Sequence, residues 1–454
     1  MWRGGGDGDG VGKFRGGTES IGGVRDSADH SPRVRFDEIT PPPFATVPPM
    51  PIDRTLTLEL LQALVRIDSR NPGLEDGAPG EREIAGFVAE QLTAWGWPAE
   101  VHDLGTSRAN VVARRRGAAG GLSLMINAHL DTVGTSGMDD PFSGAFRDGC
   151  VHGRGAQDTK GGVAAALAMA HAIAHDDTAL DGDLVLAFVA DEEHESIGTA
   201  DVVRRVRTDA AIVLEPSDLD VVVGHRGFGV FRLVVRGRRA HGGRPDLGVD
   251  ANRHMAHVLV ALDRLEADWR TAHVHPALGA ASLHVPRVEG GRHTFVYADE
   301  CVAEVECRIL PGMSPHDVTD ALRGALARVR DGGIALDATL EDVMWRAAHE
   351  IDADRPIVRA LTGAVSQVRG TPARTTYHPW WEDSALLAEA GIDAVVIGPR
   401  GGGLHTAEEW VELDSVVDLA EILQRAVGRY GLERGASPSP DPHHDPAEED
   451  TNHG

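Results

Sequence analysis

Two polar residues of the types that bind metal ions or move protons follow a buried apolar run. Residues 124–128 read Leu-Met-Ile-Asn-Ala, a pattern typical of a strand inside a sheet, and His129 and Asp131 come directly after them. Sheets of parallel strands carry their functional groups in the loops beyond the carboxyl ends of the strands. A single His-x-Asp pair is common by chance, so its meaning depends on the other strand ends.

The same arrangement recurs at four later places in the chain. Each place has a carboxylate or an imidazole just beyond an apolar run or in a glycine-rich loop, and these residues are Asp158, Glu192, Glu193, Glu215 and His405. Imidazoles and carboxylates without thiolates suit Zn, Co or Mn, and the set holds more donors than one tetrahedral ion uses. Two ions about 3.5–4 Å apart polarise a carbonyl and activate water at neutral pH. The sequence therefore predicts a two-metal hydrolytic site.

Each of these residues also has an ordinary structural role open to it. Asp158 suits a helix N-cap, and a histidine after a strand is usually a hydrogen-bonded loop residue. Glu215 precedes Pro216 and suits the end of a strand, while the acidic run at residues 191–195 suits a solvated turn. Their joint occurrence at equivalent places favours the metal site.

Composition and charge narrow the class of protein. The chain has 454 residues and a formal net charge of -26, which argues against nucleic acid and anionic membranes as partners because both need a basic face. The three cysteines, Cys150, Cys301 and Cys307, form no C-x-x-C pair, so neither a disulfide framework nor a thiolate zinc site is indicated. No apolar run is long enough to span a membrane and no secretory signal pattern is seen, so we expect a cytoplasmic enzyme.

Helices and strands alternate through most of the chain, which predicts an α/β fold with a mostly parallel sheet and helices on both faces. Between residues 224 and 343 the order changes to β-α-β-β-α-β, the ferredoxin-like α+β arrangement. We predict a disordered Gly/Pro-rich segment (1–50), a first part of a catalytic domain (51–223), an inserted domain (224–343), a second part of the catalytic domain (344–432) and a disordered acidic tail (433–454).

Six motifs in this chain resemble those of the M20 metallopeptidase family. They are HLDTV (129–133), GRGAQDTKGG (153–162), ADEE (190–193), LEP (214–216), AHGGRPDLGVDAN (240–252) and GLHTAEEWVEL (403–413). The resemblance covers residues 55–430 in order. Members of the family include acetylornithine deacetylase, succinyl-diaminopimelate desuccinylase, aminoacylases and glutamate-releasing carboxypeptidases.

The resemblance implies a role for each candidate ligand. Asp158 matches the carboxylate that bridges two metal ions, and the Asp158-Thr159 peptide bond matches one that is cis in the family. His129 and Glu215 would hold one ion, and Glu193 and His405 the other.

Further roles follow from the same resemblance. Asp131 matches the carboxylate that fixes the ring of His129. Glu192 matches the general base, which takes a proton from the attacking water and passes it to the leaving amine. His241 matches a histidine that crosses a dimer interface to stabilise the oxyanion in the partner subunit, so the inserted domain is expected to be a dimerisation (lid) domain.

Two elements of substrate binding are implied as well. Arg308 matches an arginine that pairs with a substrate carboxylate, and on an alternating strand it faces away from Cys301 and Cys307. The backbone N–H groups of Gly401, Gly402 and Gly403 are candidate donors to the same anion.

One position departs from the family pattern. Counting from the Gly290-Gly291 pair, Phe295 stands where better-known deacylases have an asparagine near the oxyanion, so that donor is missing or is supplied by another group such as Tyr297. The aromatic segment at residues 377–381 suits either an apolar substrate pocket or packing under the sheet edge.

The predicted function is a homodimeric, two-metal amidohydrolase, with Zn as the expected ion and Co or Mn as alternatives, that cleaves the amide bond of an N-acyl amino acid. A dipeptidase or carboxypeptidase of the same family is the nearest alternative. A catalytically silent relative that binds an amino-acid-like ligand is the alternative from another class, although every metal position and the base are filled.

Overall fold

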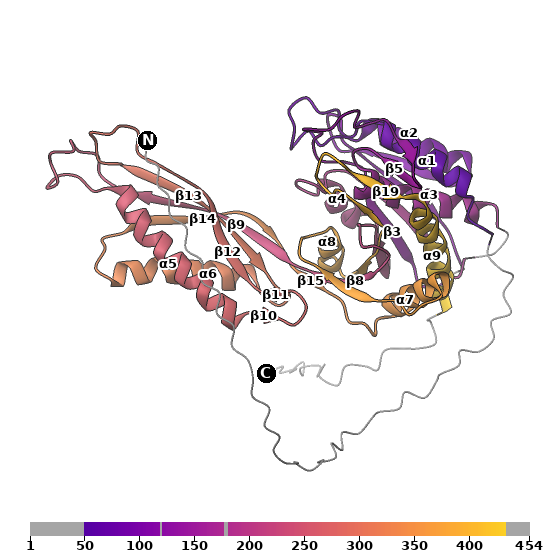
Figure 1. Cartoon of the computed structure of the whole chain (residues 1–454). Coiled ribbons are helices and arrows are strands. Elements are labelled where there is room, and N and C mark those ends of the chain that lie inside the picture. Colours follow the sequence, from indigo (N-terminus) through magenta and orange to yellow (C-terminus); the bar gives the residue numbers. More distant parts are fainter. Residues whose placement is uncertain (1–49, 119, 177–179, 433–454) are drawn as a thin grey trace, which may run out of the picture. The chain divides into compact units, whose positions relative to one another are not determined.

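The computed structural model describes residues 50–432 except 119 and 177–179 (Figure 1). The two segments predicted to be disordered fall on residues 1–49 and 433–454, outside the described part. None of the helices in the described part is long and apolar enough to cross a lipid bilayer.

A nine-stranded sheet forms the centre of the larger part of the chain. Its strands along the path are β1 (Ala99–Asp103), β2 (Ala109–Arg115), β6 (Leu184–Val189), β3 (Leu124–His129), β7 (Ala210–Val213), β17 (Asp393–Val396), β8 (Val221–His225) and β15 (His349–Glu350), and β16 (Thr375–His378) pairs with β8. The four middle strands, β6-β3-β7-β17, are parallel, whereas β1, β2, β8 and β15 join their neighbours on the path antiparallel. The additional strand β16 is parallel to β8. The predicted α/β class is confirmed, and the sheet is parallel in its middle and mixed at its edges.

Helices cover both faces of this sheet, as expected for buried strands without polar alternation. In β3, Leu124, Ile126 and Ala128 pack into one apolar cluster and Met125 into another on the opposite face. The first cluster includes side chains of α1 (Arg54–Arg66), α2 (Arg82–Ala94), α3 (Gly161–Ala174), α7 (Pro356–Arg369) and α9 (Leu413–Leu432). The second includes side chains of α4 (Ile197–Arg205) and α8 (Ser384–Glu389). Rigid packing on both faces fixes the strand ends that carry the polar loops.

The segment between β8 and β15 forms a separate four-stranded antiparallel sheet with the order β12-β13-β9-β14 (Figure 1). Its elements are β9 (Gly227–Arg236), α5 (Ala251–Ala272), β10 (Val274–His275), β11 (Gly279–Ala280), β12 (Ser282–Gly290), β13 (Glu300–Ile309), α6 (Pro315–Asp331) and β14 (Asp337–Arg346). Helices α5 and α6 share an apolar core with this sheet. Apart from the short hairpin β10-β11, the elements follow the predicted β-α-β-β-α-β order. The bounds 224–343 remain a prediction.

Strand β13 shows the expected alternation. Cys301 and Cys307 are buried in the core, and Arg308 lies on the other face. Both thiols therefore pack as small apolar groups.

A small sheet not anticipated from the sequence joins distant parts of the chain. Its order is β18 (Gly401–Gly402), β19 (Trp410–Glu412), β5 (Cys150–His152) and β4 (Ala145–Arg147). Strands of two or three residues carry too little pattern to be predicted. This sheet holds the loop of His405 beside the short helical turn η1 (Ala156–Lys160), which contains Asp158. The peptide bond between Asp158 and Thr159 is cis, as the resemblance implied.

Candidate metal and catalytic site

The ends of three parallel strands bring the predicted ligands together. His129 is the last residue of β3, Glu192 and Glu193 follow β6, and Glu215 follows β7. Because β6, β3 and β7 are neighbours and run in the same direction, their carboxyl ends open onto one edge of the sheet. The turn η1 and the loop after β18 add Asp158 and His405 from elsewhere in the chain.

Asp158 lies between two imidazoles. Its Oδ1 is 2.9 Å from His129 Nε2, and its Oδ2 is 3.2 Å from His405 Nε2. Each histidine has one further carboxylate neighbour: Glu215 Oε1 is 3.6 Å from His129 Nε2, and Glu193 Oε1 is 3.2 Å from His405 Nε2. The donors thus form two sets that share one carboxylate, and in each set the same histidine nitrogen faces both carboxylates.

Glu192 joins this group from the side of His129. One ligand atom each from His129, Glu192 and Glu215 lies within 4.8 Å of the others. Burial and the neighbouring carboxylate of Glu215 raise the pKa of Glu192 well above its usual range. A carboxyl group whose pKa is raised can hold and release a proton at a higher pH than an ordinary glutamate, as a general base must.

Asp131 organises the loop behind the site. Its carboxylate accepts hydrogen bonds from the backbone N–H groups of Glu192 (3.0 Å) and Glu193 (3.1 Å). The nearest partner of His129 Nδ1 is the backbone carbonyl oxygen of Asp131 at 2.9 Å, while the carboxylate Oδ1 is 3.6 Å away. Asp131 therefore holds the His129 ring chiefly through its backbone, and its side chain positions the Glu192-Glu193 turn.

Asn71 and Arg108 belong to the same network and were not singled out in the sequence. Asn71 Nδ2 donates to Asp131 (2.7 Å) and to Asp191 (2.9 Å). Arg108 donates to Asp191 (2.6 Å), to Glu81 (2.9 Å) and to Asn71 Oδ1 (2.7 Å). Asn71 and Arg108 do not follow the carboxyl end of a buried parallel strand, which was the pattern used to find the ligands.

The charges of the site fit divalent cations. Across residues 50–432, with 119 and 177–179 left aside, no lysine or arginine forms an ion pair with Glu192, Glu193 or Glu215. Burying several carboxylates with only imidazoles beside them is costly unless cations compensate them. The donors are oxygen and imidazole nitrogen, which suit Zn, Co or Mn. Two divalent ions therefore fit the residues present.

Three further residues considered in the sequence analysis, His241, Phe295 and Arg308, lie on the inserted segment between β8 and β15. His241 is exposed, and its Nδ1 accepts from the Gly243 N–H at 3.1 Å. Phe295 is 78% exposed, and its carbonyl oxygen accepts from the Gly242 N–H at 2.7 Å, so the loops of His241 and Phe295 are joined by their backbones. Arg308 pairs with Glu306 at 2.6 Å. None of the hydrogen bonds or ion pairs of the described residues connects His241 or Arg308 to the cluster of Asp158, so their roles remain predictions.

The glycines of the loop before His405 have a packing reason. Gly401 and Gly402 form β18 and pair with β19. A Cβ atom on Gly401 would lie 2.3 Å from the Trp410 carbonyl oxygen, and one on Gly403, where φ is +78°, would lie 1.9 Å from the Glu408 carbonyl oxygen. Only glycine fits so close a backbone approach. Donation to a substrate anion by Gly401, Gly402 and Gly403 remains a prediction.

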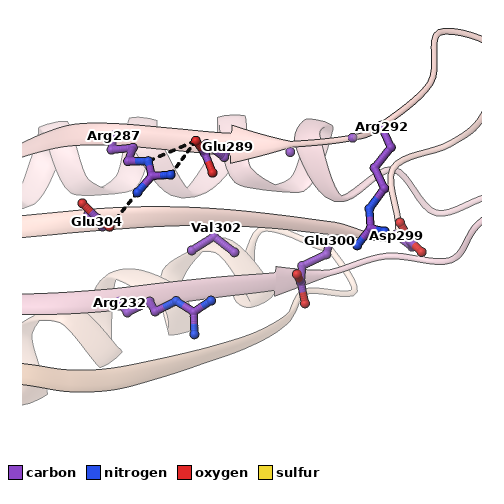
Figure 2. Close-up of a pocket in the computed structure, with 10 residues that line it drawn as sticks. Arg232, Arg287, Glu289, Arg292, Asp299, Glu300, Val302 and Glu304 are labelled. Atoms are coloured by element: carbon purple, nitrogen blue, oxygen red, sulfur yellow. Dashed lines mark hydrogen bonds and ion pairs between the residues drawn. The ribbon is translucent and has the colours of Figure 1, made fainter.

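A hollow of about 330 Å³ on the inserted sheet contains none of the predicted site residues (Figure 2). Within its lining, Arg287 pairs with Glu289 at 2.6 Å and with Glu304 at 3.5 Å. Nothing in its chemistry suggests a part in hydrolysis.

Metal binding is expected to release protons near pH 7. Hydrogen bonds to Asp158 and Glu193 raise the pKa of His405 to about 10. At His129 burial lowers the pKa of the ring. The carboxylates of Glu215, Asp131 and Asp158 outweigh this effect and raise that pKa well above its usual value. The raised pKa values favour the protonated rings in the metal-free protein, whereas a metal ion needs the neutral ring. We expect apparent metal affinity to rise as the pH increases from 7 towards 10.

Calorimetric titration with Zn²⁺ in two buffers of different ionisation enthalpy measures this release. The difference in apparent binding enthalpy between the buffers gives the number of protons displaced. Binding at pH 7 without any proton transfer to the buffer would contradict the predicted protonation of the two histidines.

The amino-acid sequence was compared with models of known protein families. The model of peptidase family M20/M25/M40 matches residues 125–429. The chain belongs to this family. As an M20 member it is a metallohydrolase that acts on amide or peptide bonds.

Two curated relatives of this M20 protein are deacylases by name. It is 28% identical over 382 residues to N-formyl-4-amino-5-aminomethyl-2-methylpyrimidine deformylase from Bacillus subtilis (strain 168), with 76% of this chain and 89% of that protein covered. It is 29% identical over 384 residues to acetylornithine deacetylase from Myxococcus xanthus, with 82% and 96% covered.

Solved structures of peptidases share the fold of this M20 protein. Aminopeptidase PepT from Bacillus cereus superposes with a TM-score of 0.70 at 18% identity, covering 84% of this chain and 99% of that chain. A dinuclear metal-binding peptidase of family M20 from Bacillus subtilis gives a TM-score of 0.64 at 16% identity, covering 82% and 97%. Identities this low support the fold alone.

Proposed function

We propose that this chain is a two-metal-dependent amidohydrolase that cleaves the amide bond of an N-acyl amino acid. The observation that supports it most directly is the position of Asp158, whose two carboxylate oxygens face two different histidines at 2.9 and 3.2 Å. A carboxylate in this position can serve two cations at once. Each side of it has one histidine and one further glutamate.

The assignment of ligands follows these two sides. His129 and Glu215 would hold one ion, His405 and Glu193 the other, and Asp158 would contribute to both. When bound, two divalent ions, zinc in our proposal, make the scissile carbonyl more electrophilic and lower the pKa of the attacking water.

The remaining chemistry belongs to side chains of the protein. Glu192 takes a proton from the attacking water and later gives it to the departing amine. The Asp131 carboxylate keeps Glu192 in place by accepting a hydrogen bond from the backbone N–H of Glu192. His241 of a second copy would stabilise the oxyanion and Arg308 would pair with the substrate carboxylate. The role of His241 requires a homodimer, which we propose together with a cytoplasmic location.

The choice of substrate rests on the curated relatives. By their names both remove acyl groups, one an acetyl group from the amino acid acetylornithine and the other a formyl group from an aminopyrimidine. The peptidases among the similar structures share less than 25% identity and support no substrate. An N-acyl amino acid is therefore proposed ahead of a dipeptide.

The test is metal content together with hydrolysis of a substrate panel. Purified protein is expected to carry about two divalent ions per chain, as in two-metal hydrolases, and to release amine from N-acetyl, N-succinyl or N-formyl amino acids faster than from dipeptides. Chelation should abolish the reaction, and adding Zn²⁺ or Co²⁺ back should restore it, which controls for damage by the chelator. Faster cleavage of dipeptides would replace the deacylase with a peptidase. Metal binding without any hydrolysis would support the catalytically silent alternative.

A further inference from the structure

Glu409 is a buried carboxylate with four hydrogen bonds and no place in the proposed chemistry. It is 2% exposed. Its Oε2 accepts from Arg154 Nη1 (2.7 Å) and from the Gly155 N–H (2.9 Å), and its Oε1 accepts from the N–H groups of Gln157 (3.0 Å) and Asp158 (3.1 Å). Three of these bonds are to the backbone of the turn that presents Asp158.

Arg154 extends this contact to two other loops. Its Nε donates to the Gly134 carbonyl oxygen, five residues beyond His129, and its Nη2 donates to the Thr406 carbonyl oxygen, the residue after His405, both at 2.9 Å. The same side chain is 2% exposed and pairs with Glu409. One buried ion pair therefore connects the loop that follows His129 with the loops that carry Asp158 and His405.

The pair is not itself part of the metal cluster. Among the described residues, the groups of ligand atoms close enough to share an ion do not include Glu409. All the contacts above go to backbone groups or between the two partners. A buried ion pair is weak evidence for stability, because desolvation offsets much of its attraction. Its bonds to these three loops indicate instead that it fixes their geometry.

We propose that Glu409 and Arg154 are positioning residues that hold the backbone of the Asp158 turn, so that its two carboxylate oxygens face His129 and His405. The inference rests on the proposed two-metal function. Glu409 acts by accepting the N–H groups of Gln157 and Asp158, and Arg154 sets the spacing of the neighbouring loops. Partners behind metal ligands commonly change metal affinity or activity by roughly 10–100-fold when altered.

Glu409→Gln is the decisive variant. The amide keeps the shape of the carboxylate but has one acceptor oxygen, and its NH₂ group faces N–H donors, so about half of the four bonds are lost. We expect faster hydrogen exchange in residues 153–160 of the metal-free protein, roughly 10–100-fold weaker metal binding by competitive titration and a similar fall in kcat with little change in KM.

Glu408→Gln is the matched control, because Glu408 is the adjacent residue and is exposed. It should leave exchange, metal affinity and kcat as in the wild type. Arg154→Lys, which keeps the charge but not the planar fork, provides a second test and should weaken metal binding in the same direction. If Glu409→Gln fails to fold, this variant decides the question.

The positioning role would be overturned if folded Glu409→Gln kept wild-type metal affinity and kcat, even with a lower melting temperature. If Glu409→Gln does not fold, the same result in Arg154→Lys would overturn it. Failure of the proposed function is distinguishable from this outcome. If the proposed function is wrong, the wild-type protein binds no metal. Hydrogen exchange in residues 153–160, compared between the wild type and Glu409→Gln, still shows whether Glu409 holds the Asp158 turn.

Discussion

Glu192→Gln is expected to lower kcat by about 10²–10⁴-fold, the usual contribution of a general base, while metal content and fold stay as in the wild type. Glutamine has nearly the same volume as glutamate, so the packing beside Glu215 is kept, but it cannot take a proton from water. The hydrogen bond from its backbone N–H to Asp131 does not depend on the side chain. Steady-state kinetics and metal analysis on the same preparation measure both effects.

Glu195→Gln is a suitable control for this experiment. Glu195 lies in the same loop, and its side chain is exposed. The control is expected to retain wild-type kcat. Activity of Glu192→Gln within a few-fold of the wild type would remove Glu192 from the mechanism, and loss of metal in that variant would make it a ligand rather than a base.

Asp158→Asn is expected to reduce metal binding at both positions and with it the activity. Asparagine has one oxygen in place of two, so it cannot face both His129 and His405 as an acceptor. The loss of affinity for at least one ion should exceed the roughly 10–100-fold typical of changes behind the ligands. Metal analysis after dialysis against a weak chelator and a titration with Co²⁺ provide the measurement.

Asp148→Asn is the matched control for this loss. Asp148 is exposed and has φ of 52°, a left-handed conformation that asparagine also adopts readily. It should bind metal as the wild type does. Two tightly bound ions in Asp158→Asn would show that Asp158 does not bridge the two sets of donors.

The sequence was most informative where a local pattern and a fold rule act together. Apolar runs identified β3, β6 and β7, and the rule for parallel strands placed the residues after them at one edge, where the structure has them. The family resemblance supplied the division of the ligands into two sets around Asp158. The observed neighbours of His129 and His405 are consistent with that division, although the roles themselves await the experiments above.

Contacts between distant segments could not be predicted in the same way. Glu409 and Asp158 are 251 residues apart, and the pair forms only because the short strands β19 and β5 bring their loops together. The aromatic segment at 377–381 left two alternatives open. In the structure the Trp381 ring lies 6.3 Å from that of Phe228, and Tyr377 donates to Glu350 at 2.8 Å, while the choice between packing and a substrate pocket stays open. Such contacts depend on tertiary arrangement, which periodicity does not encode.

The inserted sheet is connected to the large sheet through a paired ribbon. His225 of β8 pairs with His349 of β15. Three residues after His225 and three before His349, Phe228 of β9 pairs with Arg346 of β14 in the same register. The inserted segment therefore begins and ends at two neighbouring strands that pair with each other, β8 and β15. If the inserted segment were absent, a tight turn could join β8 directly to β15, because two residues are enough to connect antiparallel strands. The strand ends that carry the metal-binding loops therefore do not depend on the length of the inserted segment.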